Sequence, residues 1–140
     1  MGQVFKISEA ASIAIHALIL LGSEKEKAFT TNVIAEEFKV SKDHCAKVMQ
    51  RLTKVDLVSA KRGPKGGFFL VKDPKAITVL EIYEAIDGPL VTTSCFFKGA
   101  KPCGFPCCNL FGDLMHDVNK LAHDKFKHTT LMELIKRNDS

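Results

Sequence analysis

The sequence predicts a mainly α-helical protein with one small β-hairpin. Two short amphipathic stretches, 28–38 and 41–54, are joined by a tight connection, which is typical of paired helices. Two strand-like runs follow and flank a basic, glycine-rich segment, which indicates a hairpin. A narrow apolar stripe then recurs between residues 110 and 126, which predicts a long helix near the C-terminus.

Length and composition favour one globular domain with an additional arm. The chain has 140 residues, of which 46% are hydrophobic and 26% are charged. The longest apolar stretch, 10–21, is interrupted by Ser12 and His16 and is too short to span a bilayer. No basic region precedes it as in a signal peptide. We therefore expect a cytoplasmic protein without a membrane partner.

The first helix is predicted over residues 8–22. Ser8 is a suitable N-cap, Glu9 suits the positive end of the helix dipole, and Gly22 is expected to stop the helix. Apolar residues occupy nearly all of its faces, so we expect it to be buried on more than one side. On such a helix a buried, hydrogen-bonded histidine is the favoured reading of His16, and a metal-binding role is the alternative.

The next two helices form a helix-turn-helix pattern. Residues 39–40 make the connection, and Ser41 is the predicted cap of a helix that runs to about residue 54. Apolar residues recur at spacings of three and four on one side of this helix, whereas its cations lie largely off that stripe. The second helix of such a pair is the one that enters the major groove of DNA. The apolar stripe consists of Cys45, Val48, Met49 and Leu52.

A winged helix-turn-helix is completed by the hairpin. Its strands are predicted over 57–60 and 68–71, around the basic tip 61–67. Cations at such a tip can reach phosphates or a narrow minor groove. The candidate DNA-binding residues on the third helix and the wing are Ser41, Lys42, His44, Lys47, Arg51, Arg62, Gly63 and Lys65.

Three further helices follow the wing. Thr78 and Glu81 form a capping box that opens a helix through residue 86. The long helix carries a narrow stripe that suits a dimer seam, with intramolecular packing as the alternative, and Thr130 caps a short last helix. The predicted units are a DNA-binding domain over 1–90, a cysteine-rich loop over 91–109, and a dimerisation helix with the last helix over 110–140.

The distribution of charge supports a nucleic-acid partner. The net charge is +4, but residues 39–75 hold ten Lys or Arg against three acids, which gives +7 and leaves −3 for the rest. A basic segment in an otherwise acidic protein is the usual footprint of double-stranded DNA binding. The alternative is a solvated face of lysines.

The segment from residue 95 to residue 108, here called the cysteine segment, holds four of the five cysteines: Cys95, Cys103, Cys107 and Cys108. Clustered thiols in a reducing compartment indicate a metal site or a redox switch rather than a disulfide framework. The spacing alone leaves three alternatives open, namely an iron–sulfur cluster, a zinc site and metal-free disulfide formation. Cys45 lies on the apolar stripe and is expected to be a buried structural thiol.

The chain resembles the Rrf2 family of winged-helix regulators, of the IscR and NsrR type, over nearly its whole length. The motifs that carry the resemblance are 56–70, with Arg-Gly-Pro followed by Gly-Gly and an aromatic, and 79–86. The resemblance implies a homodimer that binds DNA and holds a two-iron or four-iron iron–sulfur cluster through Cys95, Cys103 and either Cys107 or Cys108. Some relatives carry a histidine ligand three residues after the third cysteine, where this chain has Leu110 or Phe111. In other relatives the fourth ligand lies on the first helix of the partner subunit, where this chain offers Glu9 and His16. Alternatively, the adjacent Cys107 and Cys108 can fill two coordination positions.

The expected function is sequence-specific transcriptional regulation, as a repressor, with DNA binding controlled by an iron–sulfur cluster that senses redox state, nitric oxide, or iron or cluster status. The alternative is a regulator of the same fold that works as a metal-free thiol switch or is stabilised by zinc. No enzyme is expected, because the chain has no phosphate-binding glycine loop before a helix and no catalytic triad or paired-carboxylate pattern.

Overall fold

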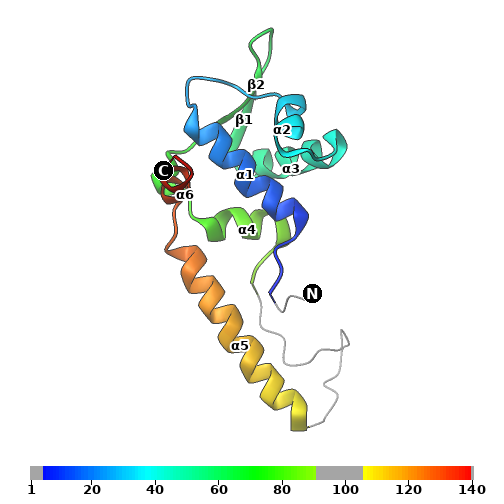
Figure 1. The fold of residues 1–140 in the computed structure, drawn as a ribbon, viewed down its shortest axis with the longest axis vertical. Helices are drawn as coiled ribbons and strands as arrows, with labels where there is room; N and C mark the ends of the chain where they lie inside the picture. The colour runs from blue at the N-terminus through cyan, green and yellow to red at the C-terminus, as the bar shows by residue number, and fades with distance from the viewer. Residues whose placement is uncertain (1–4, 91–105, 140) are drawn as a thin grey trace.

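The computed structural model describes residues 5–90 and 106–139, with side chains from residue 113 onward in the second range. Helices dominate this part of the chain and a single antiparallel hairpin accompanies them, so the predicted fold class is confirmed (Figure 1). The elements in order are α1 (Glu9–Ser23), α2 (Thr31–Phe38), α3 (Lys42–Lys54), β1 (Val58–Lys61), β2 (Gly67–Leu70), the 3-10 turn η1 (Pro74–Ala76), α4 (Val79–Asp87), α5 (Pro106–Lys127) and α6 (Leu131–Asn138).

Helix α1 is the centre of the body. Ser8 caps it by accepting a hydrogen bond from the backbone N–H of Ala11 at 3.0 Å, as predicted. The helix packs against α3, α4, α6 and β2. The sequence suggests that Gly22 ends the helix, but α1 continues to Ser23. Gly22 is buried, and a side chain there would collide with Ile135 of α6. The glycine therefore serves close helix packing.

The helix-turn-helix is built from local capping signals. Thr30 caps α2 by accepting from the N–H of Val33 at 3.2 Å. Lys39 ends that helix in the left-handed conformation with φ 55°, which turns the chain within two residues. Ser41 then caps α3 by accepting from the N–H of His44 at 3.1 Å. The predicted apolar stripe of α3 is fully buried, and the tight turn fixes α3 against α1 and α2.

The hairpin is attached to the body through a third backbone segment. β1 and β2 pair from Val58 opposite Leu70 to Lys61 opposite Gly67. Phe29, before α2, adds an antiparallel bridge to Phe68 through two hydrogen bonds of 3.0 and 2.7 Å. Gly67 has φ 141°, and a Cβ there would lie 2.6 Å from the carbonyl oxygen of Phe29. A glycine at this position is therefore what lets the wing lie against the α1–α2 connection, a contact that the sequence pattern does not predict.

Helix α6 belongs to the body, although the sequence groups it with α5. Thr78 and Thr130 cap α4 and α6 as predicted, and the two residues form an antiparallel bridge with one another. Leu131 and Ile135 of α6 lie in the same hydrophobic core as α1 and α3. The chain thus returns to the body after α5, and the core around the helix-turn-helix includes residues from both ends of the sequence.

Helix α5 projects from the body (Figure 1). It begins at Pro106, four residues before the predicted start at 110, so the backbone of Cys107 and Cys108 is helical rather than part of a loop. Phe126 near its end packs against Phe5 and Tyr83, with ring centroids 6.2 and 5.6 Å apart, which fixes the base of the helix on the body. No helix in the described residues is long and apolar enough to cross a membrane.

Candidate nucleic-acid interface and cysteine segment

Helix α3 has an exposed side opposite its buried stripe. Four exposed side chains lie there at spacings of four, three and four residues, and we call them the outward face. They are Asp43, Lys47, Gln50 and Lys54. Sequence reasoning names only Lys47 among them, because it selects residues by charge and by nearness to the helix start. The position of Gln50, seven residues after Asp43, follows from the same period that locates the buried stripe.

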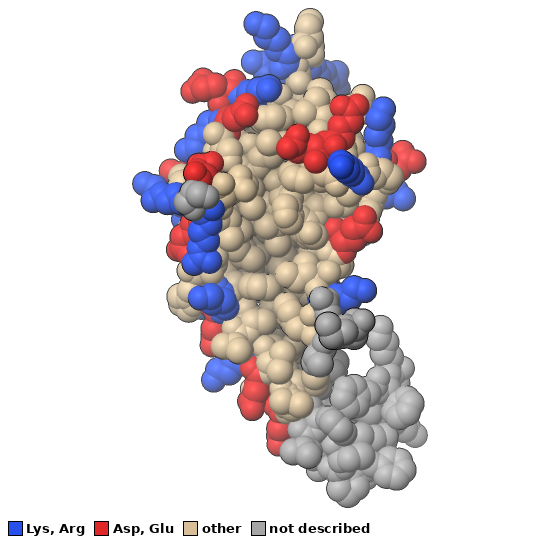
Figure 2. Space-filling view, in the orientation of Figure 1, with Lys and Arg blue, Asp and Glu red and all other residues tan. Residues whose placement is uncertain are grey.

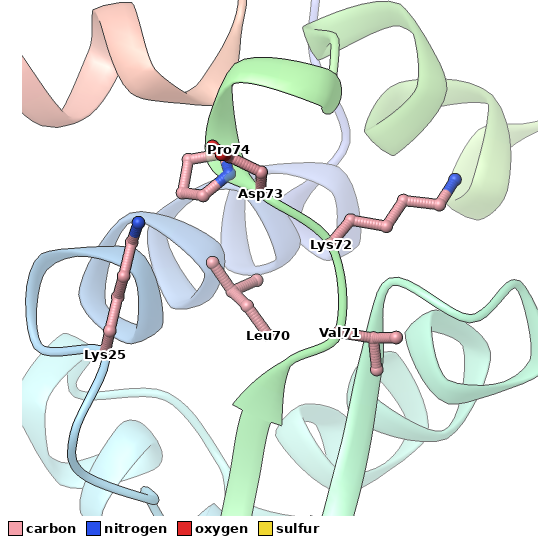
Figure 3. Close-up of a pocket in the computed structure, with 6 residues that line it drawn as sticks. All are labelled: Lys25, Leu70, Val71, Lys72, Asp73 and Pro74. Carbon is pink, nitrogen blue, oxygen red and sulfur yellow. The ribbon is translucent and has the colours of Figure 1, made fainter.

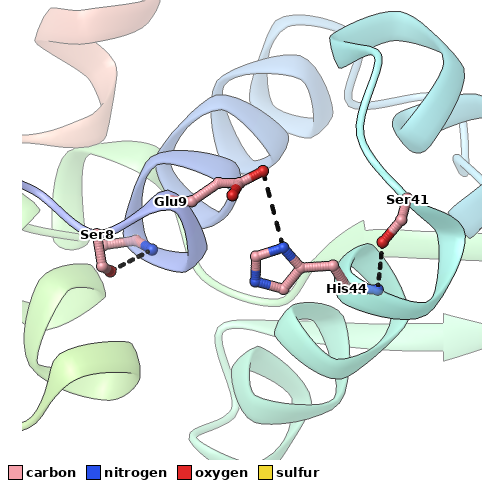
Figure 4. A network of polar contacts seen from close by, with 5 residues as sticks. Ser8, Glu9, Ser41 and His44 are labelled. Atoms are coloured by element: carbon pink, nitrogen blue, oxygen red, sulfur yellow. Dashed lines mark hydrogen bonds and ion pairs between the residues drawn. The ribbon is translucent and has the colours of Figure 1, made fainter.

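His44 lies at one edge of this outward face, near α1. Its Nδ1 atom is 3.9 Å from a carboxylate oxygen of Glu9 at the start of α1 (Figure 4). Both side chains are partly open to solvent, with 35% and 71% exposed. The structure therefore brings together a predicted DNA-binding residue and a predicted metal-binding residue near the start of α3.

Arg51 lies on the same edge, two helical turns after His44. Its guanidinium donates a hydrogen bond of 2.9 Å to the backbone carbonyl of Ile86, in the last turn of α4. The structure thus places this cation against α4 and off the outward face, whereas the sequence assigns it to DNA.

The wing tip presents cations without partners in the part of the chain that the structure describes. Arg62 and Lys65 are exposed on either side of Pro64. Gly63 has φ 108°, and its carbonyl accepts from the N–H of Gly66 at 2.9 Å, which closes a tight turn. Basic side chains gather at the end of the molecule that carries the hairpin (Figure 2).

One face of α1 carries both residues that the sequence offers as ligands for the cluster of a partner subunit. Glu9, Ser12 and His16 line an open pocket of about 200 Å³ together with Phe38 and Val40. His16 is exposed, so the favoured expectation of a buried core histidine is wrong. Its Nδ1 atom lies 2.7 Å from the carbonyl oxygen of Ser12. Because a carbonyl only accepts, Nδ1 carries the proton, and Nε2 of the neutral ring keeps a free lone pair.

The cysteine segment lies mostly outside the described residues. This holds for Cys95 and Cys103, while Cys107 and Cys108 are described only as the backbone of the first turn of α5. Within the described part of the chain, no group of three or more His, Cys, Asp or Glu side chains is placed to hold a metal ion. Cys45 is fully buried, and burial raises the pKa of its thiol. The prediction that Cys45 is a buried structural thiol is therefore confirmed.

A second hollow of about 220 Å³ lies at the base of the wing (Figure 3). Lys25 and Lys72 line it, but their ammonium groups point in different directions (Figure 3). The ammonium of Lys72 lies 2.9 Å from a carboxylate oxygen of Glu81. The two cations therefore do not converge on a common anion site.

Comparison with known proteins gives one consistent family. The family model described as Rrf2, iron-dependent transcriptional regulator, matches residues 7–137. The transcriptional regulator NsrR of Oceanobacillus iheyensis is 32% identical over 131 residues, which cover 90% of this chain and 86% of that protein.

Solved structures agree at the level of the fold. The structure of T. potens IscR matches with a TM-score of 0.75 at 21% identity, over 96% of this chain and 89% of that one. The structure of CymR, the global cysteine regulator of B. subtilis, matches with a TM-score of 0.70 at 22% identity, over 96% and 98%. The relatives are transcriptional regulators and not enzymes, as expected for this chain.

Proposed function

Because this chain belongs to the Rrf2 family of transcriptional regulators, we propose that it is a cytoplasmic homodimeric repressor whose binding to operator DNA depends on an iron–sulfur cluster. The family assignment supports DNA binding and regulation. The cluster and the dimer go beyond it and rest on the residues of this chain, and the sign of regulation is part of the proposal.

The outward face of α3 is the observation that carries the DNA-binding role. Lys47 and Lys54 project opposite the buried stripe, with the polar side chain of Gln50 between them. Cations bind phosphates of any sequence, whereas an amide such as that of Gln50 can pair with the edge of adenine in the major groove. The wing adds Arg62 and Lys65 at the flanking backbone or minor groove. Together these residues supply both affinity and base discrimination.

The donor set of the cysteine segment fits an iron–sulfur cluster. Four thiols within fourteen residues provide the soft, deprotonated ligands that such clusters require. Cys95 and Cys103 would hold the cluster together with Cys107, Cys108 or both. A bound cluster supplies an iron centre that oxidants or nitric oxide can alter. The family model that matches residues 7–137 is described as an iron-dependent transcriptional regulator, which supports this choice.

The exposed face of α1 supplies candidates for a ligand from the partner subunit. Glu9 presents a carboxylate with 71% of its side chain exposed, and His16 keeps Nε2 available. Glu9 also lies beside His44 of the recognition helix. A change at Glu9 therefore acts next to the start of α3, which offers a short connection between the cysteine segment and DNA binding.

The projecting helix α5 is our candidate for the dimer seam. Leu114 is 53% exposed and Leu121 is 73% exposed, and they lie seven residues apart with Val118 between them. Exposed leucines on a heptad-like stripe are stabilised when they meet a second copy of the same stripe.

Anaerobic purification followed by iron, sulfide and zinc analysis tests the proposed cofactor. We expect coloured protein with iron and sulfide in the wild type, and loss of both in Cys95→Ala and in Cys103→Ala. Cys45→Ala is the matched control, because its buried thiol should leave the metal content unchanged. Colourless protein with stoichiometric zinc would favour the zinc-stabilised alternative. Protein without any metal, whose DNA affinity changes on thiol oxidation, would favour the metal-free switch.

A further inference from the structure

Arg51 is chemically matched to the place where the structure puts it. The last four carbonyls of a helix lack partners within the helix, and the end of the helix dipole there favours a cation. The guanidinium of Arg51 meets one of these carbonyls, that of Ile86, at 2.9 Å. Ile86 itself is buried in the core, with 7% exposed, so this acceptor is held in a fixed position.

The same end of α4 is attached to α1 by a second polar contact. The hydroxyl of Ser8 lies 2.8 Å from both carboxylate oxygens of Asp87. Gly88 follows with φ 81°, and the chain then runs on toward Cys95. The end of α4 is thus held to α3 and to α1 just before the chain enters the cysteine segment.

Position on the helix separates Arg51 from the other cations of α3. Lys47 and Lys54 lie opposite the buried stripe, whereas Arg51 and His44 are seven residues apart along an edge that faces α4 and α1. One N–H of the Arg51 guanidinium donates to the carbonyl of Ile86 and holds the group against α4, to one side of the outward face. Moving the guanidinium onto the outward face would break this charge-assisted hydrogen bond.

We propose that Arg51 is a positioning residue that fixes the orientation of α3 against the end of α4 and makes no contact with DNA phosphate. The inference rests on the proposed DNA-binding function and assigns this cation a different role within it. Arg51 affects operator binding through the geometry of α3, and its guanidinium neutralises no DNA phosphate.

The dependence of operator affinity on salt distinguishes the two roles. The probe is a DNA duplex that the wild-type protein selects from a random-sequence library, and Kd is measured by fluorescence anisotropy between 50 and 200 mM salt, a range over which phosphate contacts change affinity strongly. The variants are Arg51→Lys, which keeps the charge, and Arg51→Met, which removes it. Lys47→Met on the outward face is the matched control.

We expect both Arg51 variants to bind about tenfold more weakly, because a lysine cannot reproduce the planar geometry of the guanidinium. The slope of log affinity against log salt concentration, here called the salt slope, should equal that of the wild type. Lys47→Met should make the salt slope less steep by about 0.9 for each protomer, because one phosphate contact is lost. A normal affinity for Arg51→Lys, together with a reduced slope for Arg51→Met, would show a phosphate contact and overturn the proposal. Unchanged affinity in both Arg51 variants would overturn it as well. If the wild type selects no DNA, the proposed function itself fails, and this outcome is distinct from the others.

Discussion

Helix α3 carries two kinds of solvent-accessible side chain, and they differ in what they contact. On the outward face, Lys47 and Gln50 project away from the buried stripe. On the neighbouring edge, His44 lies beside Glu9 of α1 and Arg51 bonds to the end of α4. Lys47 and Arg51 are both exposed cations, so neither charge nor exposure assigns them a role. The nearest partner separates them: under the proposals above Lys47 is available to DNA, whereas Arg51 fixes α3 against α4.

A substitution on the buried side of the same helix should have the largest effect on stability. Leu52 is fully buried, and Leu52→Ala removes apolar contacts and leaves a cavity. We expect the free energy of unfolding to fall by about 2–5 kcal/mol, measured by urea denaturation. Gln50→Ala on the outward face is the control and should stay within about 0.5 kcal/mol of the wild type. Similar losses in both variants would mean that the two sides of α3 are not distinct.

Substitution of Arg62 in the wing tests whether cations without protein partners contribute to DNA affinity. Arg62→Ala removes a cation from the exposed tip of the hairpin. We expect operator affinity to fall by about tenfold at physiological salt and the salt slope to become smaller, with no change in thermal stability. Fluorescence anisotropy over a salt series measures both quantities. Unchanged affinity would remove the wing from the interface.

Replacing the cap of α3 should have a smaller effect on stability. Ser41 accepts a hydrogen bond from the N–H of His44 at 3.1 Å, so Ser41→Ala leaves that donor without its cap. We expect a loss of about 1 kcal/mol in unfolding free energy. Ser41→Asp is the matched control, because aspartate caps helices equally well and should restore stability. Equal loss in both variants would indicate a role other than capping.

The contact between Glu9 and His44 should give the smallest effect on stability. It is 3.9 Å long and open to solvent, so Glu9→Gln should change the unfolding free energy by less than about 0.5 kcal/mol. If Glu9 also binds the cluster of the partner subunit, the same variant should lose iron during purification. A larger loss of stability without loss of iron would make Glu9 a structural residue only.

Much of the fold follows from local signals in the sequence. Ser8, Thr30, Ser41, Thr78 and Thr130 all cap helices, and capping depends only on residues within one turn. The buried stripe of α3 follows from its period in the same way. These signals place the ends of the first four helices within a few residues.

The long-range contacts could not be predicted, because no local pattern encodes them. The bridge from Phe29 to Phe68 and the packing of Ile135 against Gly22 join segments far apart in the chain. Arg51 belongs to the same class, because its acceptor is a backbone carbonyl 35 residues away. The exposed histidine at 16 was missed because neighbouring apolar residues suggested burial on every face of α1. The predicted roles of Cys95 and Cys103 remain predictions.

The affinity of the protein for its selected operator, measured anaerobically before and after removal of the metal centre, tests the central claim most directly. We expect the two forms to differ in Kd by between about 5-fold and about 150-fold, the range of coupling between two sites that share a conformational equilibrium. Cys95→Ala should bind with the affinity of the metal-free form. Equal affinities for all three proteins would contradict control of DNA binding by the cysteine segment.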